Sequence, residues 1–529
     1  MKNHSSLAVQ RILHTPRRCI GMLLALLLVT LLGTPRAMAA DAPGAPAAKP
    51  NVVYIITDDV GYNDFGFQGC KDIQTPNIDA LSKQSVRFTN AYVSAPVCGA
   101  SRVGIITGRY QERHSFEDTP LGNAGVAVSE ATIADALKAG GYVSAMIGKW
   151  SMGTADQFHP MRRGFDECFG FLGMLHPYVP GPVTPGLEMV MSESPRLGFG
   201  VDPPARGPRG GGLIGGTGPG SSAGKFLRGF AEVDEPEYAT EAFTREAVSF
   251  LRRHRDEPFF LYLAYNASHS PLQPTKKYLD RYPNLTGKRQ LYAATTSALD
   301  DGVGEVIATL RELKLEDNTL IVFVNDNGGA VDDIAADNAP LNGAKFQLWE
   351  GGIRVPMFVR WKGRVAEGKV VDQPIITLDL FPTVLAATHL PAPPGKELDG
   401  INLLPMLATG TDDAAQMDRV LYWRVNALTA IRKGKWKLTK PQPNVTSPLL
   451  FDLSSDVGEN KNLANENPQV VKELSDLWDK WNEKNLPVGR GGGGARRGVP
   501  AAPARGGPAR GGPARGGPAR GGPAPGGGN

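Results

Sequence analysis

The feature that most constrains the fold of this chain is a series of four apolar runs, each of which ends abruptly at polar or charged residues. The runs are NVVYIIT, YVSAMIG, FFLYLAY and TLIVFVN, at residues 51–57, 142–148, 259–265 and 319–325. Continuous apolar runs are typical of strands buried on both faces of a helix-covered sheet. Helical patterns alternate with them at about 76–85, 129–140, 238–254 and 290–313, the second with Ser129 as its expected N-cap. We therefore expect an α/β fold with a large mixed, mostly parallel sheet flanked by helices.

Reactive side chains follow all four apolar runs. They are Asp58 and Asp59 after the first run, Lys149 after the second, Asn266 and His269 after the third, and Asp326 and Asn327 after the fourth. Ligands of open α/β sheets bind beyond the carboxyl ends of the strands, so we expect these groups to converge. The aspartates and Asn327 offer only oxygen ligands, which suits Ca²⁺ or Mg²⁺ and not a zinc site. Lys149, His269 and Lys345 could complete a cradle for an anion.

The segment PVCGASR places Cys98 at the expected N-terminus of a helix, with Arg102 one turn later. Backbone N–H groups and the helix dipole favour negative charge at this position, and residues i and i+4 share a helix face. An anion held over the side chain of Cys98 fits this geometry. From this segment alone, a small buried residue ahead of a helix is the alternative interpretation.

Residues 1–40 have the composition of a signal peptide. They contain five basic residues and no acid, followed by the apolar run IGMLLALLLVTLLG and the small residues Ala37-Met38-Ala39. The run is shorter than the roughly 20 residues of a membrane span, which favours cleavage over a retained anchor. We expect an exported protein, periplasmic or extracellular, with no membrane span in the mature chain. Cleavage leaves Cys70, Cys98 and Cys168, and Cys70–Cys168 is a candidate disulfide.

Residues 487–529 are expected to form a disordered tail rich in Gly, Pro, Ala and Arg. The tail contains three GGPAR repeats, seven arginines and no acid. The chain carries a net charge of +4, of which the leader holds +5 and the tail +7, so about −8 remains on residues 41–486. An anionic substrate must therefore be held by local cations. No nucleic acid partner is expected for an exported protein, in spite of the arginines.

Seven segments occur in the order found in a known enzyme family. They are ITDDVGYNDFG, CGASR, GKWSMG, RRGFDECFGF, AYNASHSPLQ, NDNGG and AKFQLWEGGIRVP, and with the later FDLSSDVGENKNLA they cover about residues 50–485. In these segments the chain resembles the type I sulfatases of the alkaline-phosphatase superfamily, especially arylsulfatase-B-like members. The resemblance is highly specific for the family and much less specific for the substrate.

The resemblance implies a formylglycine-dependent sulfuric ester hydrolase. In this family a separate formylglycine-generating maturase oxidises one cysteine, and Cys98 occupies that position. The other roles implied are Ca²⁺ coordination by Asp58, Asp59, Asp326 and Asn327 together with the modified Cys98, contacts to the aldehyde hydrate by Arg102 and Lys149, and contacts to the sulfate and the leaving oxygen by His269 and Lys345. One hydroxyl of the hydrate attacks sulfur and the second releases sulfate, so the hydrate is a covalent catalyst that regenerates itself.

Two positions depart from the family pattern. Ala100 stands where proline is commonest, which narrows the choice of maturase, since an alanine variant also occurs in the family. Ser151 stands where the family typically has histidine, and serine can hydrogen-bond but does not exchange a proton near neutral pH. We expect from Ser151 only a polar contact. Either turnover is slowed, or His159 or His176 takes over, or the site has drifted toward another ester.

The chain is expected to divide into a catalytic sulfatase-like α/β domain at 41–414 and a C-terminal α+β subdomain at 415–486. In the latter, short strand patterns at 420–425, 428–439 and 449–453 precede a helix at about 468–485. Its Trp423, Lys435 and Lys437 could reach the cleft, or simply stabilise a small antiparallel sheet. Residues 187–230, rich in glycine and proline, are too irregular to extend the core. They form either a loop near the crevice mouth or an inert insertion.

Three functions are compatible with these observations. The leading hypothesis is an exported hydrolase that removes sulfate from a sulfated carbohydrate or an aryl sulfate. A phosphomonoester or phosphonate-ester hydrolase of the same superfamily is an alternative, because the cation cradle also suits a phosphoryl group. A weakly active or inactive homologue that binds sulfated glycans is the other alternative, and Ser151 is the reason to consider it.

Overall fold

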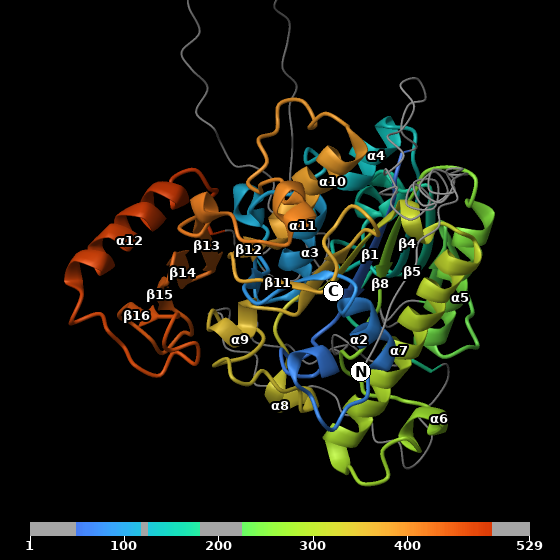
Figure 1. Cartoon of the computed structure of the whole chain (residues 1–529), viewed down its shortest axis with the longest axis horizontal. Coiled ribbons are helices and arrows are strands. Elements are labelled where there is room, and N and C mark those ends of the chain that lie inside the picture. Colours follow the sequence, from blue (N-terminus) through green and yellow to red (C-terminus); the bar gives the residue numbers. More distant parts are fainter. Residues whose placement is uncertain (1–48, 118–124, 180–224, 489–529) are drawn as a thin grey trace, which may run out of the picture.

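The computed structural model describes residues 49–117, 125–179 and 225–488 (Figure 1). The expected leader, most of the expected tail and most of the glycine-rich segment lie outside these residues. Within them the main sheet has ten strands. In spatial order they are β11 (Lys369–Val371), β2 (Val86–Phe88), β10 (Met357–Arg360), β9 (Thr319–Asn325), β1 (Asn51–Thr57), β8 (Phe259–Ala264), β4 (Val143–Lys149), β5 (Glu167–Phe171), β6 (Phe226–Arg228) and β7 (Ala231–Val233).

The four strands expected from the apolar runs are neighbours at the centre of this sheet, in the order β9-β1-β8-β4, and all are parallel. β1 pairs with β8 from Val52 to Ile56 and with β9 from Asn51 to Thr57. Their carboxyl ends therefore meet at one edge. The outer pairs of β10 with β9 and of β5 with β6 are antiparallel, so the expected mixed, mostly parallel sheet is confirmed.

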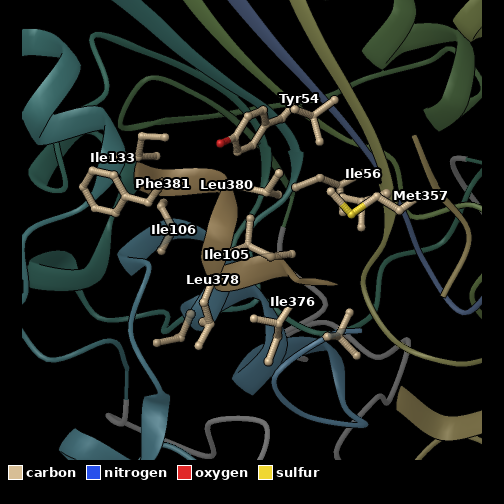
Figure 2. Packing of buried hydrophobic residues seen from close by; sticks show 14 of the residues in the cluster. Tyr54, Ile56, Ile105, Ile106, Ile133, Met357, Ile376, Leu378, Leu380 and Phe381 are labelled. Carbon is tan, nitrogen blue, oxygen red and sulfur yellow. The ribbon is translucent and has the colours of Figure 1, made fainter. Parts of the chain in front are cut away.

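Successive side chains of β1 point to opposite faces of the sheet, and helices cover both faces. Tyr54 and Ile56 belong to a buried cluster with residues of α3 and α10, whereas Val53 and Ile55 belong to a second cluster with residues of α5 and α7. Figure 2 shows the first cluster, in which Ile105 of α3 lies close to Leu380 and Leu378 below the strands. Burying an aliphatic or aromatic side chain in this way contributes about 1.5–3 kcal/mol.

The helices lie on either side of the central strands in Figure 1, with α5 and α7 on one side and α3, α10 and α11 on the other. Their bounds are α2 (Pro76–Ser82), α3 (Cys98–Thr107), α4 (Ile133–Ala139), α5 (Ala239–Arg253), α6 (Lys276–Leu279), α7 (Gly287–Glu312), α8 (Val331–Ile334), α9 (Glu350–Ile353), α10 (Leu380–Thr388), α11 (Leu404–Thr409) and α12 (Pro468–Asn482). A two-stranded sheet pairs β3 (Ala91–Tyr92) with β12 (Ile375–Ile376).

The expected N-cap of α4 is wrong. The cap is Thr132, whose hydroxyl accepts from the Asp135 backbone N–H while the Asp135 carboxylate accepts from the Thr132 backbone N–H. This capping box satisfies two N–H groups of the first turn, whereas Ser129 lies too far upstream to reach them. The helix is accordingly shorter than its apolar pattern indicated.

A smaller antiparallel sheet follows in the chain, and with α12 it lies at one end of the molecule in Figure 1. Its strands are β13 (Val420–Val425), β14 (Leu428–Lys433), β15 (Trp436–Lys440) and β16 (Leu449–Asp452). The single strand expected at 428–439 is thus wrong, because the chain reverses at Gly434, whose φ of 55° is a left-handed conformation that glycine adopts without steric cost. The expected fold class is confirmed, whereas the boundaries at residues 414 and 486 stay a prediction.

Two further expectations need correction. The glycine-rich segment 187–230 was not expected to extend the core, yet β6 near its end adds a strand to the sheet, anchored by Phe226, which is 5% exposed, and β7 follows directly after the segment. Cys70 and Cys168 are both free and buried, so the candidate disulfide is absent between these two described residues. Along the described parts of the chain, none of the helices is both long enough and apolar enough to cross a membrane.

Candidate active site

The carboxyl ends of the four central strands bring the expected polar residues together. The backbone of Asp58 donates to the carbonyl of Ala267 at 3.0 Å and accepts from the N–H of Ser268 at 2.8 Å, while Asp326 N donates to the carbonyl of Thr57 at 3.0 Å. These bonds tie together the loops after β1, β8 and β9. Asp59 adopts a φ of 60°, an uncommon left-handed conformation for a residue other than glycine. The strands and these loop contacts therefore fix the positions of the Asp58 and Asp59 carboxylates.

Cys98 is the first residue of α3 and is 2% exposed. Its neighbour across the site is Ser151, whose hydroxyl lies 3.8 Å from the Cys98 sulfur. Ser151 follows β4 and has a φ of 59°, so the chain turns sharply after Lys149. The expected helix start at Cys98 and the expected polar contact from Ser151 are both present in the geometry.

Four basic side chains surround the carboxylates. Lys149 Nζ lies 2.5 Å from Asp58 Oδ2, and Lys345 Nζ lies 2.7 Å from Asp59 Oδ2. Arg102 donates from Nε to Asp326 Oδ2 at 2.9 Å and from Nη1 to the carbonyl of Lys149 at 2.9 Å. His269 Nε2 lies 3.1 Å from Lys345 Nζ and 3.4 Å from Asp59 Oδ2. All of the residues expected at the site from the sequence are thus grouped in one buried cluster, with Asn327 donating to Asp59 Oδ1 at 2.7 Å.

The tautomer of His269 follows from its second nitrogen. Nδ1 lies 2.6 Å from the carbonyl of Ser270, an acceptor only, so Nδ1 carries the proton and Nε2 presents its lone pair toward Lys345 and Asp59. Burial, and then the positive charges of Lys345 and Lys149, lower the pKa of His269 to about 4. The ring is therefore a neutral imidazole at ordinary pH.

The carboxylates have unlike electrostatic surroundings. Burial alone would raise the pKa of Asp58, but Lys149, His269 and Arg102 together lower it. In Asp59, Lys345 and His269 likewise outweigh burial and lower the pKa. The pKa of Asp326 is raised, because burial and the nearby Asp58 carboxylate outweigh Arg102. Close carboxylates in a buried site repel one another, and further positive charge between them would relieve the repulsion.

The residues present fit a divalent cation. Ligand atoms of Asp58, Asp59 and His269 all lie within 4.8 Å of one another. Asp58 Oδ1 and Asn327 Oδ1 are buried and accept no hydrogen bond, and buried oxygens without a donor are costly unless a cation or water satisfies them. An oxygen-dominated ligand set is the one that Ca²⁺ and Mg²⁺ prefer. The compact group includes His269 in place of Asp326, whose Oδ2 faces Arg102.

Sequence reasoning missed Asn325, the last residue of β9. Its Oδ1 accepts from the Thr57 hydroxyl at 2.8 Å and from the Val60 N–H at 3.2 Å, and its Nδ2 donates to the Val60 carbonyl at 2.8 Å. Asn325 thus clamps the loop that carries Asp58 and Asp59 to the end of β9. An amide at the end of an otherwise apolar run is the signal that could have revealed it.

The residues named from the small sheet do not line the cleft. Trp423 is buried and donates from Nε1 to the carbonyl of Val93 at 2.7 Å, Lys437 is buried beside Glu350 at 2.9 Å, and Lys435 is half exposed and pairs with Asp452. His159 stacks on Phe230 with ring centroids 4.4 Å apart, and His176 packs on Phe226 at 4.3 Å. The histidine that meets the carboxylates is His269.

Two family models match the chain. The model of the sulfatase family matches residues 50–390, and a model named for the C-terminal part of N-sulphoglucosamine sulphohydrolase matches residues 344–485. The chain belongs to the sulfatase family. The resemblance seen in the sequence motifs is confirmed, and the chain is a sulfuric ester hydrolase.

Relatives with known names cover most of this sulfatase. The N-acetylgalactosamine-6-sulfatase of Homo sapiens is 31% identical over 489 residues, which is 82% of this chain and 85% of that protein. The N-acetylgalactosamine-6-O-sulfatase of Bacteroides thetaiotaomicron is 30% identical and covers 82% of this chain and 93% of its own length. Among solved structures, Ps i-CgsB in complex with k-i-k-neocarrahexaose is 34% identical, has a TM-score of 0.73, and matches 83% of this sulfatase and 94% of its own chain.

Proposed function

We propose that this sulfatase is an exported enzyme that removes sulfate from a sulfated carbohydrate, with Cys98 as the precursor of its nucleophile. The observation that carries the proposal is the position of Cys98, buried at the N-terminus of α3 beside a ring of cations. Asp59, followed by Cys98, raises the pKa of Lys345, and Asp326, followed by Asp58, raises that of Arg102, so both cations stay charged beside Cys98. A buried position with this much preorganised positive charge suits an anionic ester.

Two groups would complete the site. Formylglycine, formed from Cys98 by a separate maturase, would supply a hydrated aldehyde whose hydroxyl is the nucleophile. A divalent cation, Ca²⁺ before Mg²⁺, would supply positive charge to the sulfate oxygens and the nucleophile. The side chains proposed to hold it are Asp58, Asp59, Asp326 and Asn327, with residue 98. The orphaned oxygens of Asp58 and Asn327 support this assignment.

The remaining cations are proposed to hold the nucleophile and the sulfate. Arg102 and Lys149 stand between the start of α3 and the end of β4, where they can orient the side chain at position 98. Lys345 stays charged, because Asp59 outweighs the effect of burial and raises the pKa of the ammonium. Lys345 can therefore donate hydrogen bonds to sulfate oxygens and to the leaving oxygen, while the neutral His269 can accept a proton at Nε2.

The carbohydrate substrate is inferred from the relatives. Two of them are named for 6-sulfated N-acetylgalactosamine, and a similar structure holds a neocarrahexaose. A steryl-sulfatase of Mus musculus is also 32% identical. The relatives therefore share the name of sulfatase but differ in the alcohol that carries the sulfate. Export after cleavage near residue 40 is tested by the N-terminal sequence of the mature protein.

The test is a comparison of substrates with the matured enzyme. We expect release of sulfate from sulfated galactosaminyl oligosaccharides or carrageenan fragments, with turnover of an aryl sulfate well above that of the matching aryl phosphate. Faster turnover of the phosphate would favour a phosphoester hydrolase. Binding of a sulfated glycan without sulfate release, by protein in which residue 98 is modified, would favour the glycan-binding alternative.

A further inference from the structure

Lys345 is carried by a segment that contacts the small C-terminal sheet. The segment runs from residue 345 to Glu350, the first residue of α9. Lys345 N donates to the carbonyl of Gly329 at 3.2 Å, and Phe346 N donates to the carbonyl of Pro96, two residues before Cys98, at 2.8 Å. The start of the segment is therefore bonded to the loops of the catalytic site.

The other end of the segment is bonded to the C-terminal sheet. Leu348 N donates to the carbonyl of Pro441 at 3.0 Å, and Glu350 N donates to Oε2 of Glu459 at 2.6 Å. Pro441 directly follows β15, and Glu459 lies in the loop after β16. A Cβ atom on Gly352 would lie 2.0 Å from the carbonyl oxygen of Gln347, so α9 and the segment are in close backbone contact.

A buried ion cluster lies where the two parts meet. Lys437 Nζ, on β15, lies 2.9 Å from Glu350 Oε1 and 2.8 Å from Glu459 Oε1, and all three side chains are fully buried. The second oxygen of Glu350 accepts from the hydroxyl of Tyr92 at 2.6 Å. One ammonium thus bridges two buried carboxylates. Glu350 Oε2 also lies 3.3 Å from Arg354 Nη1, whereas the ion pair of Glu459 is with Lys437, so moving Glu459 away from the ammonium would leave its charge buried and unpaired.

The backbone at both ends of this contact adopts the left-handed region. Phe346 has a φ of 70° and Glu459 a φ of 52°. Residues other than glycine keep such conformations only where the surrounding contacts enforce them, and these positions are concentrated at functional sites. Here the enforcing contacts are the bonds to Pro96 on one side and to Glu350 and Lys437 on the other.

We infer that Lys437 is a positioning residue of the active site. Its buried ammonium fixes Glu350 against Glu459 and thereby holds the 345–350 segment, so that Lys345 stays beside Asp59 and His269. This inference rests on the role proposed above for Lys345. It makes the C-terminal sheet a working part of the catalytic machinery, although no side chain of that sheet needs to touch the substrate.

The first test removes the ammonium. K437M keeps the length of the side chain but leaves the Glu350 and Glu459 carboxylates facing each other. K437M/E459Q also removes the charge of Glu459, so that this repulsion does not prevent folding. We expect kcat of K437M/E459Q on a sulfate ester to fall on the order of 10- to 100-fold, with a much smaller change in KM, as for residues that orient catalytic groups. An unchanged kcat would overturn the inference.

A double-mutant cycle separates positioning from general stability. In a K345A background the position of residue 345 no longer matters, so adding K437M/E459Q should cause little further loss of kcat. Losses that multiply in full would show that Lys437 acts independently of Lys345 and would overturn the inference.

A matched control uses another ion pair between the same two parts. Arg424, on β13, pairs with Glu117 at 2.5 Å, and both side chains are almost fully buried. The bonds that hold the 345–350 segment involve neither Arg424 nor Glu117. R424M/E117Q should lower Tm to a similar extent and leave kcat unchanged. An equal loss of kcat in both double variants would mean that any break between the two sheets impairs the enzyme, and Lys437 would have no special role.

Hydrogen exchange tests the positioning without any turnover. The amides of Phe346, Leu348 and Glu350 should exchange faster in K437M/E459Q than in the wild type, and R424M/E117Q should leave them protected. If the wild type hydrolyses no sulfate ester, the proposed function fails, while this comparison still decides the positioning. Unchanged protection of all three amides in K437M/E459Q would overturn it.

Discussion

The hydroxyl of Ser151 lies 3.8 Å from the sulfur of Cys98, where both side chains are buried at the end of the central strands. A hydroxyl at this position can donate one hydrogen bond, but it does not take up or release a proton near neutral pH. Proton transfer around residue 98 must therefore depend on other groups. His269 is the described histidine that meets the carboxylates, and its lone pair faces Lys345.

Replacing Ser151 with histidine should raise activity. The left-handed backbone at Ser151 is one that histidine tolerates better than most residues, and an imidazole there could exchange a proton with the group at position 98. We expect S151H to increase kcat roughly tenfold or more, within the range of general acid–base effects. S151A is the control for loss of the hydroxyl alone. If S151H and S151A show the same reduced kcat, proton transfer at this position is not what limits the enzyme.

Removal of divalent cations should abolish turnover and reduce stability. Asp58, Asp59 and Asp326 then repel one another in a buried site, and the oxygens of Asp58 and Asn327 stay unsatisfied. A cation present at 100 times its Kd would stabilise the fold by about 2.7 kcal/mol. After chelation we expect a lower Tm, with recovery of both Tm and kcat on addition of Ca²⁺ and weaker recovery with Mg²⁺. An enzyme that keeps full activity and an unchanged Tm in chelator would contradict the proposed metal site.

Loss of the Lys345 ammonium should lower kcat on the order of 10²- to 10³-fold, the range for removal of one preorganised donor. The variant K345M keeps most of the side-chain volume, so folding is affected mainly through the lost contact with Asp59. K435M is the matched control, because Lys435 is half exposed and pairs with Asp452 of the small C-terminal sheet. Its kcat should equal that of the wild type. A similar loss in both variants would exclude a specific role for Lys345.

Cys70 and Cys168 should be slow to react in the native protein. Burial, aided by Asp72, raises the pKa of the Cys70 thiol to about 11, and burial raises that of Cys168 to about 12. Only the thiolate is the nucleophile, so labelling near pH 8 should be slow and should speed up as the pH rises toward these values. Unfolding in denaturant should expose both thiols at once. Rapid labelling of the native protein at neutral pH would contradict the burial of these two residues.

The sequence predicted those parts of the fold that depend on local pattern. The strands 51–57 and 319–325 match β1 and β9 residue for residue, since a strand buried on both faces is continuously apolar and stops at its first charged residue. The start of α3 at Cys98 was also predictable. The hairpin at Gly434 was missed, because Gly434 is the one turn-forming residue between β14 and β15 and the strand-like pattern continues on both sides of it.

The sequence predicted which residues make up the candidate site, but it did not predict which of them pair with one another. Which lysine meets which aspartate depends on the strand order, and that order is set by contacts between residues more than 200 positions apart in the chain, as for Asp59 and Lys345. The ion cluster around Lys437 was missed for the same reason, whereas Asn325 carried a local signal, the amide at the end of an apolar run. The local sequence around a lysine does not show whether its side chain is buried or solvated. Only the tertiary structure therefore reveals that Lys437 bridges Glu350 and Glu459.

The central claim is that Cys98 is converted to formylglycine, and mass spectrometry of the protein from its native host tests it most directly. Trypsin should release a peptide from Phe88 to Arg102 that contains residue 98. The account predicts the mass expected when an aldehyde replaces the thiol, together with a product of reaction with a hydrazine reagent. An unmodified Cys98 thiol in all of this peptide, from enzyme that still hydrolyses sulfate esters, would contradict the account.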